Sequence, residues 1–208
     1  MIIAVDGPSA AGKGTLARAI AAKLGYHFLD TGTLYRAVGF LMLRQGKPLD
    51  DEKAAAAIAA GMDPGKIRDE DLRNEAVAAA ASKVSAYPEV RARLLDFQRS
   101  FARRKPGAVL DGRDIGTVVC PDADLKFFVT ASLEERARRR FEELRSLGQH
   151  VKLETVMDEM IRRDERDASR TTAPTRPAAD AILVDTSDLE RDEVLHLVLD
   201  VIASQHQG

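Results

Sequence analysis

Short apolar runs alternate with longer amphipathic stretches along most of this chain. The short runs are rich in β-branched and aromatic residues, which predicts buried strands. The predicted strands are residues 2–5, 27–29, 108–110, 125–129 and 181–184. The longer stretches repeat their apolar residues every three or four positions, as helices do. The predicted helices are residues 14–24, 33–44, 52–60, 71–85, 89–104, 133–147, 153–168 and 190–204.

The alternation of strands with helices predicts the fold class. Strands that are separated by helices pair in parallel and bury both faces of their sheet under those helices. We therefore expect an α/β fold, a three-layer α/β/α arrangement around a five-stranded parallel sheet. Ser132 and Ser187 each precede a Glu by three residues, which predicts a capping box at the start of the next helix. Ligands of such sheets bind at the carboxyl ends of the strands.

Two segments depart from this alternation. Residues 47–104 form an Ala-rich helical block, and residues 146–178 combine a charged helix with a Thr- and Pro-rich return. A chain of 208 residues fits one domain. We expect a core of residues 1–46, 105–145 and 179–208, from which the two other segments project as mobile covers over a site.

A glycine-rich turn joins the first predicted strand to the first helix. It reads Gly7-Pro8-Ser9-Ala10-Ala11-Gly12-Lys13-Gly14-Thr15. Backbone N–H groups and the start of a helix cradle phosphates in such a P-loop, and Lys13 adds a cation for the β- and γ-phosphates. Thr15 or Ser9 offers a hydroxyl to the phosphates or to Mg²⁺. The Lys-Gly-Thr ending is typical of nucleoside monophosphate kinases, which favours a small-molecule kinase over a GTPase or a motor protein.

Acidic residues follow the first three predicted strands. They are Asp6, Asp30 and Asp111, and all three belong to the same edge of the expected sheet. Asp111 is suited to hold Mg²⁺ through water. The alternative for Asp111 is a cap on the turn that follows it. The same two interpretations apply to Asp6, where we give less weight to a catalytic role.

Arginines are concentrated in the second departing segment. They are Arg162, Arg163, Arg166, Arg170 and Arg176, with Asp164, Glu165 and Asp167 between them. Arg163, Arg166 and Arg170 share one face of a continuous helix. Such a pattern is either a solvated, salt-bridged helix or a lid whose arginines close on a transferred phosphoryl group. The P-loop favours the lid. We interpret the triplet 138–140 as mostly solvated surface.

Composition excludes several other classes. The formal net charge is −2, and the chain has no Trp and few aromatic residues, so it lacks the features of a nucleic-acid-binding surface. No apolar run reaches the length of a membrane span, and no basic leader precedes the first strand, which predicts a cytoplasmic protein. The single Cys120 predicts a packed apolar side chain. No His lies at metal-ligand spacing, and we expect a monomer.

Several segments together resemble bacterial-type cytidylate kinases. The segments are residues 30–36 (Asp-Thr-Gly-Thr-Leu-Tyr-Arg), 111–119 (Asp-Gly-Arg-Asp-Ile-Gly-Thr-Val-Val), 81–84, 88–91 and 163–170. The resemblance runs from Ile3 to about Asp185. It implies ATP-dependent, Mg²⁺-assisted phosphorylation of CMP and dCMP, with an NMP-binding insert at residues 47–104 and a lid at residues 146–178.

The resemblance also implies a role for individual residues. Residues 7–15 would hold the ATP phosphates, with Thr15 at the metal. Thr31, Arg36 and Arg113 would face the CMP phosphate, Arg91 and Asp114 the cytosine, and Ser82, Arg163 and Asp167 the sugar. Arg170 would reach the phosphates from the lid. Lys13, Asp111, Arg113, Arg163 and Arg170 would form the catalytic set.

The chain departs from the family pattern in two places. Ala10 stands where Gly is frequent, so the turn must accommodate a Cβ atom. Residues 47–76 lack the strand alternation that many relatives have. Two alternatives stay open beside a cytidylate kinase. One is a kinase for another acceptor, such as UMP or a shikimate-like alcohol, and the other is a nucleotide-binding switch without turnover.

Overall fold

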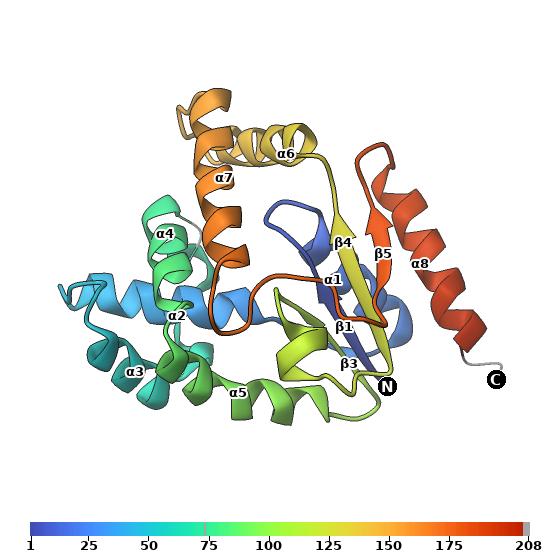
Figure 1. Ribbon diagram of the computed structural model, residues 1–208, viewed down its shortest axis with the longest axis horizontal. Coiled ribbons are helices and arrows are strands. Elements are labelled where there is room, and N and C mark those ends of the chain that lie inside the picture. Colours follow the sequence, from blue (N-terminus) through green and yellow to red (C-terminus); the bar gives the residue numbers. More distant parts are fainter. Residues whose placement is uncertain (73, 206–208) are drawn as a thin grey trace.

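The computed structural model describes residues 1–72 and 74–205, and its centre is one parallel sheet (Figure 1). Its strands are β1 (Ile2–Asp6), β2 (His27–Asp30), β3 (Ala108–Asp111), β4 (Leu125–Thr130) and β5 (Ile182–Asp185), in the order β2-β3-β1-β4-β5. Each strand ends one residue later than the hydrophobic pattern predicts. The ladder continues past the last apolar side chain, as where Asp30 aligns with Asp111.

Eight α-helices surround the sheet in the described part of the chain. They are α1 (Lys13–Leu24), α2 (Thr31–Arg44), α3 (Glu52–Gly61), α4 (Glu75–Val84), α5 (Pro88–Ala102), α6 (Leu133–Ser146), α7 (Leu153–Ala168) and α8 (Arg191–Gln205). Shorter turns are η1 (Pro64–Lys66), η2 (Asp69–Leu72) and the π-helical η3 (Ile115–Val119). All eight predicted helices are present.

Helix starts account for the main differences from the sequence prediction. The helix predicted from residue 71 begins at Glu75, because the Asn74 side chain caps it by accepting from the Val77 N–H. Ser132 caps α6 as predicted, by accepting from the Glu135 N–H. The capping box predicted at Ser187 is wrong: its hydroxyl donates to Asp185 instead, and α8 begins at Arg191.

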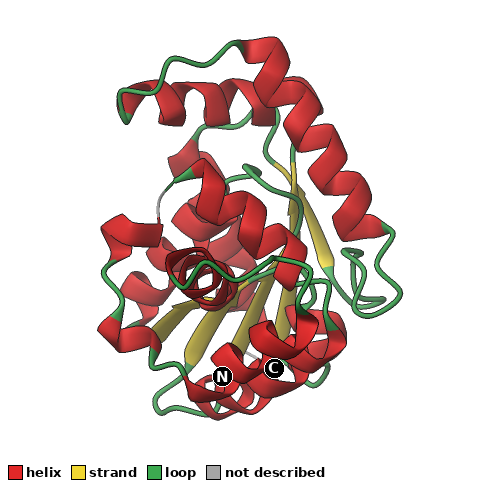
Figure 2. Ribbon diagram, turned by 90° about the vertical axis from the view of Figure 1, so that its left-hand side faces the viewer, coloured by secondary structure: helices red, strands yellow, loops and turns green. Residues whose placement is uncertain are grey.

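The alternation of side chains along the strands divides the core into two layers. Ile3 and Val5 of β1 point to one face, where they join a cluster with residues of α1 and α8. Ala4, between them, points to the opposite face and joins Phe101 of α5 and Ile115 of η3. Helices therefore cover both faces of the sheet (Figure 2), and the predicted three-layer α/β/α fold is confirmed.

Helices α2 to α5 form a second cluster beside the sheet. Its buried side chains include Leu34, Val38, Val84 and Leu94. The Ala-rich composition serves a close crossing of α2 and α4: a Cβ atom on Gly39 would lie 2.9 Å from the Cβ of Ala80. Small residues on both helices let the two backbones approach and place α4 over the carboxyl edge of the sheet.

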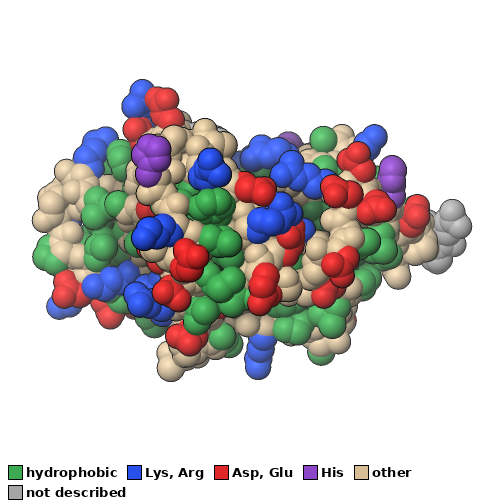
Figure 3. Space-filling view, turned by 90° about the horizontal axis from the view of Figure 1, so that it is seen from above, with side chains coloured by type: hydrophobic (Ala, Val, Ile, Leu, Met, Phe, Trp, Pro, Cys, Tyr) green, Lys and Arg blue, Asp and Glu red, His purple; other side chains and the backbone are tan. Residues whose placement is uncertain are grey.

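Helices α6 and α7 form a hairpin that stands away from the sheet (Figures 1 and 2). The hairpin has a small hydrophobic cluster of its own, with Ala137 and Leu144 of α6 against Val156 and Met160 of α7. Its upper face in Figure 3 shows basic and acidic side chains interleaved, in keeping with ion pairs along α6 such as Arg138–Glu142. Among the described residues, no helix combines the length and apolar character that a membrane span needs.

Candidate active site

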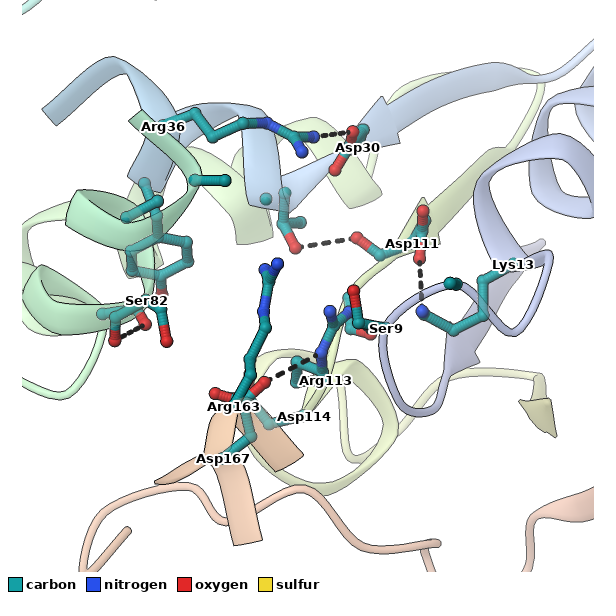
Figure 4. A pocket seen from close by; sticks show the side chains of 18 of the residues that line it. Ser9, Lys13, Asp30, Arg36, Ser82, Asp111, Arg113, Asp114, Arg163 and Asp167 are labelled. Atoms are coloured by element: carbon teal, nitrogen blue, oxygen red, sulfur yellow. Dashed lines mark hydrogen bonds and ion pairs between the residues drawn. The ribbon is translucent and has the colours of Figure 1, made fainter. Parts of the chain in front are cut away.

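A cavity of about 250 Å³ opens at the carboxyl edge of the sheet, between the P-loop, α2, α4 and α7 (Figure 4). Most of the side chains that the sequence singles out line it. They are Ser9, Ala10, Lys13, Thr31, Arg36, Ser82, Arg91, Asp111, Arg113, Asp114, Arg163, Asp167 and Arg170. Gly14 and Thr15 line a second, more open cavity that shares Asp30 and Arg36 with the first. Segments that are far apart in the sequence thus meet at one site.

The P-loop is held tightly against the sheet. Gly7 has a φ of 143°, and a Cβ atom there would lie 1.9 Å from the carbonyl oxygen of Val129, so only glycine fits. Lys13 is buried, and its Nζ donates to the Pro8 carbonyl at 2.7 Å. Burial and the nearby Arg113 lower the pKa of Lys13 to about 8, although Asp111 opposes this.

Ala10 occupies a backbone conformation that favours glycine. Its φ is 59°, in the left-handed region. The turn has room for the Cβ atom, but the backbone is strained there. The methyl group packs against the cluster of α6 and α7. This contact gives the alanine side chain a partner that a glycine would lack.

Helix α6 supports the P-loop from above, through residues that the sequence interpretation missed. Arg136 donates to the Ser9 carbonyl at 3.3 Å and to Asp164 at 2.6 Å. Arg139 donates to the hydroxyl of Thr186 at 2.9 Å, and Thr186 in turn donates to the Ala11 carbonyl at 3.2 Å. The loop backbone is thereby fixed from the α6 side as well as from the sheet.

The interpretation of residues 138–140 as mostly solvated surface is wrong. Only Arg138 faces solvent, whereas Arg139 supports the P-loop. Arg140 lines the cavity and forms an ion pair with Glu75 at the start of α4, which joins α6 to the helical insert. The spacing of 136, 139 and 140 is the signal in the sequence, since these positions share one helix face.

The cations on the opposite side of the cavity are paired with carboxylates. Arg91 forms a buried ion pair with Asp114. Arg113 lies 3.3 Å from Asp167, which also accepts from Arg170. Arg36 and Asp30 are 2.5 Å apart (Figure 4). Each of these arginines thus has a carboxylate partner inside the cavity.

Arg163 is the exception among these arginines. It extends from α7 toward the centre of the cavity, and its buried Nε has no hydrogen-bond partner among the described residues (Figure 4). Burial, together with the nearby Arg113, lowers the pKa of Arg163 to about 10. Arg166, predicted on the same face, is exposed and does not line the cavity, and Arg170 follows the end of α7 at Ala168.

Other buried polar atoms at the site also lack partners in the described part of the chain. They are Ser82 Oγ, Asp111 Oδ1 and Arg170 Nε. Buried polar atoms are nearly always hydrogen-bonded, so a set of unsatisfied ones around a cavity indicates that a polar ligand completes them. The set contains both hydrogen-bond donors and acceptors.

Asp111 is the carboxylate nearest to the P-loop lysine. Its Oδ1 lies 4.0 Å from Lys13 Nζ, and burial raises its pKa to about 6. A Cβ atom on Gly14 would lie 3.0 Å from Oδ2, so the carboxylate reaches the start of α1 beside Thr15. The Thr31 hydroxyl donates to the Asp111 main-chain carbonyl at 2.7 Å. No cluster of three or more His, Cys, Asp or Glu side chains suited to a metal occurs in residues 1–72 and 74–205.

Cys120 and Asp6, which the sequence analysis also singled out, do not line the cavity. Cys120 is buried in the core cluster with Ile115 and Val119, which confirms a packing role, and burial raises its pKa to about 11. Asp6 is buried but does not line the cavity; its carboxylate accepts backbone N–H groups instead.

Comparisons with known proteins agree with this geometry. The family model for cytidylate kinase matches residues 3–204, beyond the predicted limit near Asp185. A cytidylate kinase of Rhodospirillum rubrum is 53% identical over 211 residues, covering 100% of this chain and 99% of the relative. One of Rhodopseudomonas palustris is 50% identical over 208 residues, covering 100% and 98%.

Solved structures with similar folds are more distant in sequence. A gluconokinase from Sinorhizobium meliloti has a TM-score of 0.53 at 16% identity, covering 98% of this chain and 91% of that one. The protein TT1252 from Thermus thermophilus has a TM-score of 0.52 at 21% identity, covering 100% and 98%. These likenesses support the fold only.

Proposed function

Because the chain belongs to the cytidylate kinase family, we propose that it transfers the γ-phosphate of ATP to CMP or dCMP, giving ADP and CDP or dCDP. The observation that carries this proposal is one cavity shared by two elements. The P-loop with Lys13 stands at one side, and the buried Arg91–Asp114 pair stands at the other.

The Arg91–Asp114 pair suits cytosine. The base presents an amino donor at C4 and acceptors at N3 and O2, so a carboxylate accepts from the amino group while a guanidinium donates to N3 and O2. Uracil reverses the polarity at C4 and N3 and leaves both groups mispaired. Each mispaired buried contact costs about 1–3 kcal/mol, so two of them give a preference of tens- to thousands-fold for CMP over UMP.

The remaining side chains suit the ribose phosphate. We assign Arg36, Arg113 and Thr31 to the phosphate, because two guanidinium groups line the cavity with the Thr31 hydroxyl. The Thr31 proton would turn from the Asp111 carbonyl to the phosphate when the acceptor binds. We assign Ser82, Arg163 and Asp167 to the sugar, on the strength of the unpartnered Ser82 hydroxyl and the Arg163 Nε.

The transfer itself needs alignment and charge stabilisation more than covalent chemistry. An oxygen of the CMP phosphate attacks the γ-phosphorus of ATP, and the bond to the bridging oxygen of ADP breaks. Lys13 and the P-loop amides offset charge on the donor phosphates, while Arg113, Arg163 and Arg170 offset it on the transferred group. We propose that the insert (residues 47–104) and the lid (residues 146–178) close over the substrates and exclude water.

We further propose that Mg²⁺ accompanies ATP. The residues fit this ion: the unpartnered Asp111 Oδ1 and the Thr15 hydroxyl are hard oxygen donors near the start of α1. So few protein ligands suit a cation that keeps several waters and is held largely by the nucleotide. When bound, Mg²⁺ neutralises charge on the β- and γ-phosphates.

A coupled ADP-release assay with ATP and Mg²⁺ tests the proposal, with CMP, dCMP, UMP and AMP offered in turn. We expect fast release with CMP and dCMP, weak release with UMP and none with AMP. Comparable rates with all four acceptors contradict the assigned base site, and release without any acceptor indicates an ATPase or a switch. Since one chain supplies every assigned residue, we propose an active monomer, to be checked by size-exclusion chromatography at assay concentration.

A further inference from the structure

Asp6 is the last residue of β1, and both oxygens of its buried carboxylate accept hydrogen bonds. Oδ1 accepts from the Ile115 N–H at 2.8 Å, and Oδ2 accepts from the Gly116 N–H at 2.7 Å. These two amides open η3 and directly follow Asp114 in the chain. A side chain outside the cavity therefore holds the backbone of the turn that carries Arg113 and Asp114.

The turn has little room to shift away from Asp6. A Cβ atom on Gly116 would lie 3.1 Å from the Lys126 side chain and 3.4 Å from Asp6 Oδ2. At the other end, a Cβ atom on Gly112 would lie 2.8 Å from Thr31 Oγ1, and the Gly112 N–H donates to the Val5 carbonyl at 3.0 Å. Both ends of the turn are thus hydrogen-bonded to β1, one end to the Val5 carbonyl and the other to the Asp6 side chain.

We infer that Asp6 is a positioning residue for the acceptor base: its carboxylate fixes the Ile115 and Gly116 amides and thereby aims Asp114 at the ligand. The inference rests on the proposed function, in which Asp114 reads cytosine. Two adjacent amides need two acceptor oxygens, which an ionised carboxylate has and an amide side chain lacks. An Asn at position 6 leaves one N–H facing an NH₂ group.

The ionisation of Asp6 gives the inference a second readout. Burial raises its pKa to about 7, although the two backbone N–H groups lower it. The carboxylates that face it, Asp114 and Asp111, raise it further, while Lys13 from the P-loop and Lys126 behind Gly116 are the cations nearby. Protonation leaves one oxygen as a donor, so the turn loses an acceptor as the pH falls from 8 to 6.

The test compares Asp6→Asn with Cys120→Ser, a control that disturbs the buried end of the same turn but touches neither amide. Calorimetry without donor gives the Kd of CMP and of UMP, and a separate titration gives the Kd of a non-hydrolysable ATP analogue. We expect Asp6→Asn to weaken CMP binding about tenfold, the equivalent of one lost hydrogen bond, and to lower the CMP-to-UMP affinity ratio. The ATP-analogue Kd stays within about twofold, and Cys120→Ser changes none of these values.

The wild-type enzyme provides the same test without a variant, should Asp6→Asn not fold. CMP and UMP share the phosphate ionisation, so their affinity ratio cancels it. We expect this ratio to fall several-fold between pH 8 and pH 6, and to become independent of pH in a folded Asp6→Asn variant. A wild-type ratio that is constant over this range overturns the inference.

Two other results separate this inference from the proposed function. If Asp6→Asn weakens the binding of CMP and of the ATP analogue equally, Asp6 serves only the general fold and the positioning role is overturned. The same conclusion follows if Asp6→Asn weakens the binding of neither ligand. If Asp114→Asn leaves the CMP-to-UMP ratio unchanged, the base-reading assignment fails. In that case a selective loss of CMP affinity in Asp6→Asn still supports a turn that Asp6 aims at the acceptor.

Discussion

The two ends of the cavity are built in different ways. The donor end is one continuous segment, residues 7–15, which offers backbone amides and a lysine that donates to a carbonyl of its own loop. The acceptor end gathers side chains from α2, α4, α5, α7 and the turn after β3, and its arginines other than Arg163 are paired with carboxylates. The donor end is thus one continuous turn that tertiary contacts hold in place, whereas the acceptor end is assembled from distant segments by tertiary packing.

Pairing with carboxylates allows many arginines to be buried around one cavity. A buried cation without a partner is expensive, whereas a paired one is tolerated. Asp114, Asp167 and Asp30 serve as partners for Arg91, Arg170 and Arg36. The donor end has only one buried cation, and its neighbour Asp111 is 4.0 Å away.

Lys13→Met breaks the donor end with the largest expected effect. The side chain keeps its length but loses the charge that faces the donor phosphates, so we expect kcat to fall by about a thousandfold or more. Steady-state kinetics with saturating CMP measure this. Lys23→Met, at the exposed end of the same helix and outside both cavities, is the control and keeps its activity; a Lys13→Met variant with near-normal kcat contradicts the P-loop assignment.

The same variant shifts the pH dependence of stability. Lys13 has a folded pKa of about 8 against 10.5 in the unfolded chain, so between these values only the unfolded state keeps the proton. The burial cost of the charged form is therefore fully present below pH 8 and disappears as the pH rises to 10.5. In urea denaturation, we expect the stability of the wild type relative to Lys13→Met to be lowest below pH 8 and to rise between pH 8 and pH 10.5. A constant difference argues against a depressed lysine pKa.

Asp114→Asn breaks the acceptor end. It removes the carboxylate that suits the cytosine amino group and leaves Arg91 buried beside an amide. We expect the preference for CMP over UMP, measured as a ratio of kcat/KM, to fall tens-fold or more. The Kd of an ATP analogue is the internal control and stays unchanged, because Asp114 lies outside the P-loop (residues 7–15). Equal losses for CMP and UMP mean that Asp114 only supports Arg91.

Glu75→Gln tests whether the two ends are coupled. Glu75 joins the start of α4 to Arg140 of α6, between the insert and the hairpin. We expect KM for CMP to rise about two- to fivefold with kcat nearly unchanged, since a partly exposed pair contributes little. Glu142→Gln is the control, because Glu142 pairs with the exposed Arg138 within α6 and lines neither cavity. Identical kinetics for both variants mean that the Glu75–Arg140 ion pair does not affect CMP binding.

Ala10→Gly has the smallest expected effect. The substitution relieves a left-handed alanine but removes a methyl contact with the α6–α7 cluster and loosens the unfolded chain. We expect the free energy of unfolding to rise by up to about 1 kcal/mol. Ala11→Gly, at a fully buried neighbour without a positive φ, is the control and lowers stability. A loss in Ala10→Gly means that the methyl contact outweighs the strain.

Local sequence patterns are enough to predict the order of the elements, the P-loop and the acidic edge of the sheet. Each of these depends on residues within a few positions of one another, such as the apolar run before Gly7 or the carboxylate after a buried strand. The family resemblance added the assignments of Arg91 and Asp114, which no local pattern would have paired. The structure brings the two side chains into contact.

The packing of the elements sets which charged side chains face the cavity. Arg139 and Arg140 differ from Arg138 by their direction around α6, and Arg166 is excluded because α7 turns it outward. Asp6 reads as one more acidic residue at a strand end, yet its partners lie more than a hundred residues away. Helix and strand periods are set by local backbone geometry, whereas the partner of a charge is set by how the elements pack, and a residue's neighbours in sequence do not contain that information.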